Sequence, residues 1–429
     1  MTIMIYIRVL LFAIFFFGTA GKILFAQNWR GTVNADWNNS ANWSSWPLNN
    51  VNIVIDPVNY TGAGASPAIS SASVFTPQKI LIQNGASVLI QNNLTTNDNV
   101  DVLGTGTLLT IQGGTVNIGL AANGRLMADL GAAIIIQNGT LDAGRTLAVG
   151  GASTITMNNG TINNIPRILM DLGGKFIFNN GNIVAGERLA IGDGDLINAS
   201  LFQMNGGSLT VNTELTLVNE FGNHTPTINM AGGTLTVNGN VLWLGISPGS
   251  GAPQFNITGG TTTINGNIQN TAGSTVNLNM NISGTGRVDF NGTLIEMISA
   301  ADSIKQTNNT LFFFNNTAAW INAGVYSATN AQVSFNGNTQ LQGTGIFSFD
   351  DILINSTKTL DHFSPYNINV KGDLINHGNF ISNLNKVSLN GNGAQVIDGN
   401  SITSFYTLYV TNPSVQGVTV KKSIMVTGF

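Results

Sequence analysis

Residues 204–212 read Met-Asn-Gly-Gly-Ser-Leu-Thr-Val-Asn, and residues 230–238 read Met-Ala-Gly-Gly-Thr-Leu-Thr-Val-Asn. After each glycine pair, small polar residues alternate with apolar ones, which is typical of a strand with one buried face. Gly-Gly and Asn-Gly pairs tolerate positive φ, as a sharp corner requires. The stretch therefore predicts a strand that follows a tight turn.

Versions of this phrase recur between residues 80 and 264, and the last glycine of each marks its position. The markers are Gly85, Gly114, Gly139, Gly160, Gly181, Gly207, Gly233 and Gly260. The steps between successive markers are 29, 25, 21, 21, 26, 26 and 27. Such steps indicate a solenoid, and they are too short for a helical crossover. We predict an all-β fold, a single right-handed parallel β-solenoid (β-helix) with coils of 21–29 residues and about 16 coils in all.

The composition agrees with stacked coils and excludes several functional classes. Only 8% of the 429 residues are charged, against roughly a quarter in typical globular domains. Apolar residues make up 43% of the chain at regular spacing, which is not a signature of disorder. The net charge of −4 and the absence of a basic patch argue against a nucleic-acid partner. The chain has no cysteine, so disulfides and thiol chemistry are excluded.

Residues 1–26 have the pattern of a secretory signal peptide. Arg8 supplies positive charge, and residues 9–17 form an apolar segment too short to span a bilayer. Cleavage after Ala20 and cleavage after Ala26 both fit the sequence. No later stretch could cross a membrane as a helix, so we expect a secreted or outer-surface protein without a membrane span in the mature chain.

Residues 27–59 are rich in tryptophan and carry two competing hypotheses. Four of the six tryptophans of the chain lie here: Trp29, Trp37, Trp43 and Trp46. Their flat rings could stack on sugars, which makes them candidate ligand-binding residues. Alternatively, they could cover the open apolar end of the first coil, since a solenoid needs a cap to stay soluble. We favour the cap.

This segment also carries a resemblance to a known group of proteins. Trp29-Arg-Gly is followed by Asp36-Trp37, Asn42-Trp43, Pro47 and an alternating Ile/Val strand near residue 53. The order resembles the start of gram-negative β-helical surface proteins of the autotransporter-like or adhesin-like kind. The Gly-Gly-Thr-Leu-Thr-Val rungs are similar to their passenger regions. The resemblance implies surface display, with a C-terminal sorting domain after many further repeats.

Residues 60–293 are predicted to form the regular solenoid, and one set of basic residues recurs within it. Arg125, Arg145, Arg167 and Arg188 follow each other at steps of 20, 22 and 21, each before an apolar strand. They should stack on one edge of successive coils. They are candidate ligands of an anionic polysaccharide. Alternatively, they are solvated corner residues paired in part with Asp129 and Asp171, and we favour this second interpretation.

The rhythm of the sequence changes twice toward the C-terminus. In residues 294–332, Leu294, Met297, Ile298, Ala301 and Ile304 fit a helical stripe, which predicts an irregular break with a short helix. In residues 333–429, the phrase at 333–338 returns only at 387–392. We interpret this longer unit as two coils. The second copy stops at residue 429, which predicts that further C-terminal repeats or a sorting domain are missing.

No catalytic residue, metal site or cofactor can be named from the sequence. Asp350-Asp351 is an isolated acidic pair, which we interpret as a solvated edge because the matching phrase carries Tyr406-Thr407. Asp193 and Asp195 could bind Ca²⁺, but calcium needs six to eight oxygens, and an ordinary turn is favoured. His224, His362 and His377 are isolated and are interpreted as loop residues.

Three functional hypotheses follow. The leading one is a non-catalytic, structural or adhesin-like rod that displays Asn, Thr and Ser ladders to a glycan, a surface polymer or a partner chain. The alternative is a polysaccharide-acting enzyme, a lyase or a glycosidase, which would need a groove with two or more acidic residues beside aromatics. A third class, a crystal- or ice-binding surface, would need a flat threonine array, at which Thr261-Thr-Thr263 hints.

Overall fold

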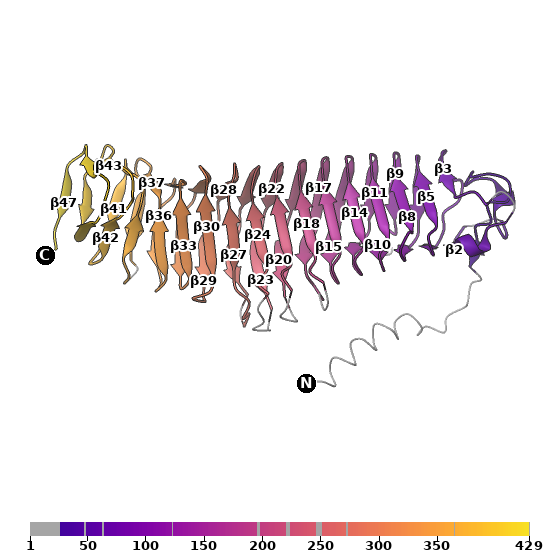
Figure 1. Ribbon diagram of the computed structural model, residues 1–429. Coiled ribbons are helices and arrows are strands. Elements are labelled where there is room, and N and C mark those ends of the chain that lie inside the picture. Colours follow the sequence, from indigo (N-terminus) through magenta and orange to yellow (C-terminus); the bar gives the residue numbers. More distant parts are fainter. Residues whose placement is uncertain are drawn as a thin grey trace, which may run out of the picture.

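The computed structural model describes residues 26–428 apart from 47–48, 62–63, 122, 195–197, 220–223, 246–250, 272 and 364. The expected signal peptide, residues 1–26, lies outside the described residues except for its last position. The described chain forms one straight rod with its N-terminal end (indigo) and C-terminal end (yellow) far apart (Figure 1). About half of the chain is strand, arranged as a parallel β-solenoid of about 17 turns. The predicted fold class is confirmed.

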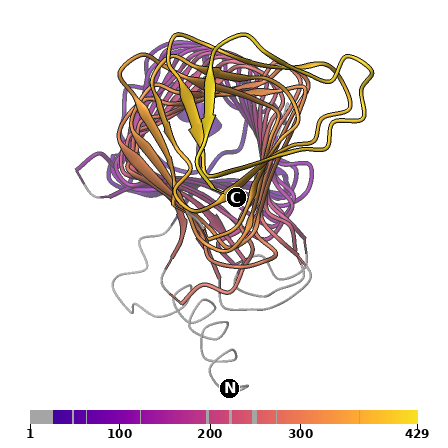
Figure 2. The same ribbon diagram turned by 90° about the vertical axis from the view of Figure 1, so that its left-hand side faces the viewer.

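From β5 (Ser87–Ile90) onward, each coil contributes one strand to each of three faces, and the coils superpose along the rod axis (Figure 2). One coil illustrates the order: β8 (Leu108–Ile111) lies on face one, β9 (Thr115–Ile118) on face two and β10 (Arg125–Asp129) on face three. Every strand pairs in parallel with the corresponding strand of the next coil, as Gln332↔Asp351 and Thr227↔Gln254 illustrate. Faces two and three join as one sheet through the continuous strands β15 (Thr161–Met170) and β17 (Asn182–Ile191).

Face one is a single sheet of sixteen strands that runs the length of the rod. These strands are β3 (Ala68–Ile69), β5 (Ser87–Ile90), β8, β11 (Ala133–Ile136), β14 (Thr154–Met157), β16 (Lys175–Phe178), β18 (Leu201–Met204), β21 (Thr227–Met230), β24 (Gln254–Ile257), β27 (Asn279–Ile282), β30 (Ser303–Thr307), β33 (Val325–Thr329), β36 (Ile346–Phe349), β39 (Ile368–Val370), β42 (Lys386–Leu389) and β45 (Thr407–Val410).

The core is a set of apolar columns inside the rod. The period-two pattern places every second side chain inward, and in-register pairing stacks it on its equivalent in the next coil. On face one, for example, Ile155 lies between Ile134 and Phe176. All three side chains are fully buried. Burial of this kind, repeated coil after coil, stabilises the fold at about 25 cal/mol per Å² of apolar surface.

Seven of the eight marker glycines form a column at the corner between faces one and two, here called the glycine corner. They are Gly114, Gly139, Gly160, Gly181, Gly207, Gly233 and Gly260, all with positive φ. From Gly139 onward, a Cβ on each would collide with the backbone of the corresponding turn one coil earlier. Gly85 is the exception, because it follows β4 (Lys79–Gln83) on face three and so lies at another corner. The step from Gly85 to Gly114, the longest in the series, is therefore not a coil length.

Asparagine side chains form a second column at the corner between faces two and three. Each member after the first donates an amide N–H to the side-chain oxygen of its equivalent in the preceding coil, for example Asn291 to Asn265 at 2.8 Å and Asn315 to Asn291 at 2.9 Å. The members are Asn212, Asn238, Asn265, Asn291, Asn315, Asn336 and Asn355. These amides therefore bond mainly to one another, which reduces what the ladder can offer to a ligand.

The expected helical break in residues 294–332 is wrong. The segment contains β29 (Leu294–Met297), β30, β31 (Leu311–Phe314), β32 (Ala318–Asn322) and β33, all in the regular coil order. The helical spacing arose because apolar residues from two strands flank a short turn. Asp302 closes that turn by accepting the N–H of Ser299 at 2.9 Å and that of Leu278 at 2.8 Å.

The interpretation of the longer unit in residues 333–429 as two coils is also wrong. Val333 lies in β34 (Gln332–Phe335) on face two, whereas Val387 lies in β42 on face one. Coils in this part are no longer than elsewhere, because Gln332 pairs with Asp351 and Leu374 with Ile397, one coil later in each case. The same short phrase therefore serves two different faces, and no longer structural period begins at residue 333.

Candidate functional site

The tryptophans at the N-terminal end form a packed cluster. Trp29, Trp37 and Trp43 are at most 4% exposed, and Trp43 meets the other two edge-to-face at centroid distances of 4.9 and 4.8 Å. Their indole N–H groups donate to Ala65 O, Ser73 Oγ and Trp37 O at 2.7, 3.0 and 2.9 Å. Three buried and hydrogen-bonded indoles have no face left for a sugar, so they act as the cap.

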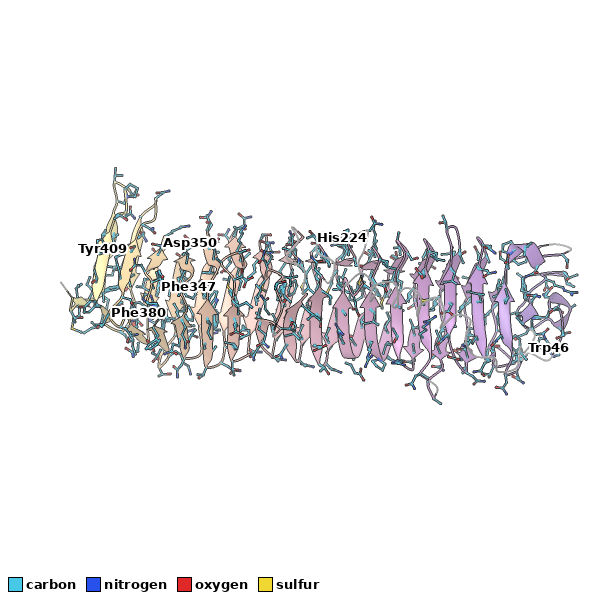
Figure 3. The ribbon with its side chains drawn as sticks, turned by 90° about the horizontal axis from the view of Figure 1, so that it is seen from below. Trp46, His224, Phe347, Asp350, Phe380 and Tyr409 are labelled. Carbon is cyan, nitrogen blue, oxygen red and sulfur yellow. The ribbon has the colours of Figure 1, made fainter. Side chains whose placement is uncertain are left out.

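Trp46 differs from the other three. It is 39% exposed and packs edge-to-face on Phe75 at 5.1 Å, at the N-terminal end of the rod (Figure 3). Of the predicted tryptophan site, only this ring is open to solvent, and one ring does not make a platform for a chain of sugars. The Pro47 of the resemblance lies outside the described residues.

The arginines come together only in part. Arg167 pairs directly with Arg188 across face three, and Arg125 falls in the same column because both Arg125 and Arg167 pair with Thr146. Arg145 precedes Thr146 and is therefore one position out of this column. The spacing of the arginines in the sequence is nearly even, so it did not distinguish these two positions.

The arginines of the column are matched by carboxylates. Arg125 pairs with Asp101 at 3.1 Å, Arg167 with Glu187 at 2.9 Å and Arg188 with Glu214 at 3.3 Å. These partners replace the predicted ones, Asp129 and Asp171, because a residue of the adjacent coil is closer than one further along the same strand. Paired in this way, the column has no net positive stripe to offer an anionic polysaccharide.

An open cleft of about 860 Å³ runs along the glycine corner near the C-terminal end. It spans five successive coils, and Asp350 lies within it, far from the Trp46 end of the rod (Figure 3). Its lining is polar: Asn309, Thr310, Leu311, Thr329, Asn330, Ala331, Gln332, Asp350, Asp351, Lys371, Gly372, Asp373, Asn390, Gly391, Asn392, Gly393 and Ala394. We refer to it as the acidic cleft.

The cleft forms because the segments that connect face one to face two become shorter and then longer in successive coils. Residues 308–310 connect β30 to β31, but only Asp350 connects β36 to β37 (Asp351–Ile354). The longer segment 390–394 then connects β42 to β43 (Gln395–Asp398). A short corner between two longer ones leaves a hollow at Asp350.

Three carboxylates hold the backbone of this corner together. Asp350 Oδ2 accepts the N–H of Ala331 at 2.8 Å, and Asp351 Oδ1 accepts that of Asp373 at 2.6 Å. Asp373 Oδ1 in turn accepts the N–H of Val396 at 2.8 Å. Each carboxylate thus replaces a ladder hydrogen bond where the strand has turned, and each is half-buried rather than fully solvated. The interpretation of Asp350-Asp351 as a solvated edge is wrong.

Like charges meet in the cleft. Asp351 and Asp373 occupy matching positions on adjacent strands, because Ile352 pairs with Leu374. Burial raises the pKa of the Asp351 carboxyl above its ordinary value, the N–H of Asp373 opposes this, and the charges of Asp350 and Asp373 raise the pKa further. Lys371 is the one cation among the lining residues. The cleft is therefore electronegative at neutral pH.

Two side-chain oxygens at the cleft have no partner among the described residues. Thr310 is 1% exposed, and its Oγ1 accepts and donates no hydrogen bond. The buried Oδ1 of Asn390 is likewise without a donor. Both atoms are shielded from solvent, so each is an unsatisfied buried acceptor that costs free energy.

Beside the cleft, face two carries an outward aromatic residue. Phe312 and Phe314 point into the core and stack at 4.9 Å. Phe313 between them faces outward, and the guanidinium of Arg287 lies 4.4 Å from its ring centre. Arg287 also pairs with Asp289 at 2.8 Å.

The interpretation of the histidines as loop residues is wrong for His362. His362 is fully buried in β38 (Thr359–His362), with Nε2 2.7 Å from the carbonyl oxygen of Tyr366. Burial lowers the pKa of this imidazole below its ordinary value. Neither His362 nor the other described histidines belong to a group of three or more metal-ligating side chains. Asp195 of the candidate calcium turn lies outside the described residues.

Comparison with protein-family models, with curated proteins and with solved structures finds no match for this chain. The resemblance to autotransporter-like surface proteins therefore stays a hypothesis based on Trp29–Trp43 and the glycine rungs. Among the helices within the described ranges, none has the length and apolar character to span a membrane.

Proposed function

We propose that this chain is a non-catalytic, adhesin-like β-solenoid of the cell exterior that binds a glycan or surface polymer in the acidic cleft. The cleft itself supports this proposal, since it runs across five coils and is lined by amides, hydroxyls and carboxylates. Each carboxylate already accepts a backbone N–H of a neighbouring coil, which is a structural role. Export rests on the signal-like residues 1–26.

The test is binding of the purified protein to a broad glycan array, with reducing-end release assayed on every hit. We expect binding without turnover, and weaker binding when Gln332 or Asn309 in the cleft is replaced by alanine. Replacement of an outward residue of another face, such as Gln203, serves as the matched control. If cleft substitutions leave every hit unchanged, the proposed site is wrong.

A glycosidase is the second candidate, favoured by the placement of Asp351 and Asp373. Matching positions on adjacent strands are about 4.8 Å apart, and retaining glycosidases hold two carboxyl groups about 5–5.5 Å apart. The raised pKa of Asp351 is the property that a general acid needs. Release of reducing ends that Asp351→Asn abolishes would establish this candidate. A polyuronate lyase has less support, since three carboxylates would repel its substrate.

A further inference from the structure

Face two carries a regular set of polar side chains in the middle of the rod. The set spans seven strands that lie next to one another along one side of the rod (Figure 1). They are β9, β12 (Thr140–Ala143), β15, β17, β19 (Ser208–Val211), β22 (Thr234–Val237) and β25 (Thr261–Ile264). In each strand the second residue is buried in the core, whereas the first and third face outward. The outward side chains therefore form two columns along the rod.

We call these two columns the hydroxyl array. Its members are Thr115, Asn117, Thr140, Asp142, Thr161, Asn163, Asn182, Val184, Ser208, Thr210, Thr234, Thr236, Thr261 and Thr263. Nine of the fourteen bear a hydroxyl, and Asp142 is the one charged member. Charged side chains follow just beyond the array, at Arg287 and Asp289 of the next strand, β28 (Arg287–Phe290). The array is thus a nearly neutral region of face two.

The in-register pairing of the strands gives the array two fixed repeats. Equivalent members face each other coil after coil, as Ser208, Thr234 and Thr261 do in one column. The repeat along the rod axis is the strand separation, about 4.8 Å, and the repeat across the face is the rise of two residues, about 6.8 Å. Threonine is β-branched, which restricts its χ1 angle, so little further ordering is needed on binding.

The hydroxyls at the centre of the array are bound by water rather than by the protein. Those of three adjacent coils make no hydrogen bond to any described residue, although none of their side chains is buried: Ser208, Thr210, Thr234, Thr236, Thr261 and Thr263. At the neighbouring corner, by contrast, the asparagines bond to one another, as Asn265 does to Asn238 at 2.9 Å. Because each exposed hydroxyl can donate and accept, water satisfies these six groups in solution.

We propose that the hydroxyl array binds the surface of ice. Water molecules held by rigid hydroxyls take on the two repeats of the array, and both repeats are close to the spacings between water oxygens on the faces of hexagonal ice. A neutral array favours this partner, because a fixed ionic charge orients water around itself instead of into a lattice. The inference goes beyond the proposed function and does not depend on the acidic cleft.

A crystalline solid accounts for both columns of the array, whereas a soluble ligand does not. A single hydrogen bond to a neutral hydroxyl contributes little net free energy, so many must form together for measurable binding. A single polymer chain repeats in one direction and would use one column. The two columns are equivalent in the coils of Ser208 and Thr234, where a second hydroxyl follows two residues later in each strand. A partner that repeats in two directions uses every one of these groups.

The experiment measures how strongly the purified protein inhibits ice recrystallisation, with uptake of the protein into a slowly growing ice crystal as a second readout. We expect the wild type to be active in both assays. Thr236→Lys places bulk and charge at the centre of the array and should raise the concentration needed for inhibition at least about tenfold. Thr236→Val removes the hydroxyl and keeps the shape, so its effect should be smaller and in the same direction.

Two control variants assign the effect to face two. Thr156→Lys makes the same change at an outward position of β14 on face one, and Asp351→Asn changes the acidic cleft. Both should keep the activity of the wild type toward ice. Circular dichroism should show an intact solenoid in all four variants, because each substitution is at a position that is not fully buried.

Several outcomes would overturn the inference. Absence of inhibition and of uptake for the wild type would do so, as would equal activity of the wild type and Thr236→Lys. Equal loss of activity in Thr156→Lys would show that the effect is not specific to face two. Retention of the protein on crystalline cellulose or chitin without activity toward ice would assign the array to another solid. The glycan test of the acidic cleft stands apart from all of these results.

Discussion

Alanine substitutions at three glycines separate two costs that usually occur together. One is the cost of a left-handed backbone conformation, and the other is the cost of steric overlap with the preceding coil. Gly160 has φ of +104°, and a Cβ there would lie 2.5 Å from the carbonyl oxygen of Gly139. Gly85 also has positive φ, +81°, but its Cβ would meet nothing within 4 Å. Gly393 is equally open and its φ is not in the left-handed region. These three positions form a matched series.

The expected losses follow from these geometries. Gly393→Ala should be neutral or stabilise slightly, because alanine restricts the unfolded chain by about 0.4–1 kcal/mol. Gly85→Ala should cost about 1–2 kcal/mol, the price of a left-handed conformation for an L-residue. Gly160→Ala adds an overpacking cost of about 1–3 kcal/mol, because the rung beneath must move. The total for Gly160→Ala is therefore roughly 2–5 kcal/mol.

The assay is urea unfolding followed by far-UV circular dichroism, with hydrogen exchange to locate the change. Exchange should accelerate in the strands next to Gly160, β14 and β15, since each coil contacts only its neighbours. A Gly160→Ala midpoint equal to that of Gly85→Ala would refute the reasoning. It would mean that the column tolerates a methyl group and that only φ requires glycine.

Three further predictions have defined outcomes. Burial and neighbouring charges raise the pKa of Asp351 above 3.8 in the folded protein. Protonation of Asp351 therefore favours the folded state, and the protein loses stability as pH rises through the folded-state pKa. Asp351→Asn should therefore raise the melting temperature at pH 7 and match wild type well below pH 3.8. Trp43→Ala should cost about 3–5 kcal/mol in urea unfolding, and Trp46→Ala about 1 kcal/mol or less. Asn291→Ala breaks two amide hydrogen bonds, at about 1 kcal/mol each, and should lower the urea midpoint about twice as much as Asn212→Ala, which breaks one.

The fold could be predicted from sequence because its two requirements are local. Alternation of apolar residues sets which face is buried, and glycines such as Gly160 set where the chain turns. The boundaries of the coils were harder to predict, because the phrase that ends in Gly85 lies at one corner of the coil and the phrase that ends in Gly114 lies at another. The stripe from Leu294 to Ile304 fitted a helix for a related reason: strand, turn and strand can mimic its spacing.

The cleft could not be predicted in the same way. It depends on the difference in length between successive corners, a single residue at Asp350 against the segment 390–394, and no single phrase shows that difference. Asp351 and Asp373 are distant in the sequence, and only the register of the coils brings them together. The adjacency of Asp350 and Asp351 was the one signal present. The burial of Trp29, Trp37 and Trp43 was predictable as a cap.

The coils at Ala133, Thr154 and Lys175 are evenly spaced in the sequence, with every strand of face one in register. Removing residues 154–174 would thus join two equivalent positions and shorten the rod by one rung, about 4.8 Å. The rod is in this sense a ruler. The number of coils sets the distance between its capped end and the acidic cleft. Adding or removing whole coils would change that distance and leave both ends unaltered.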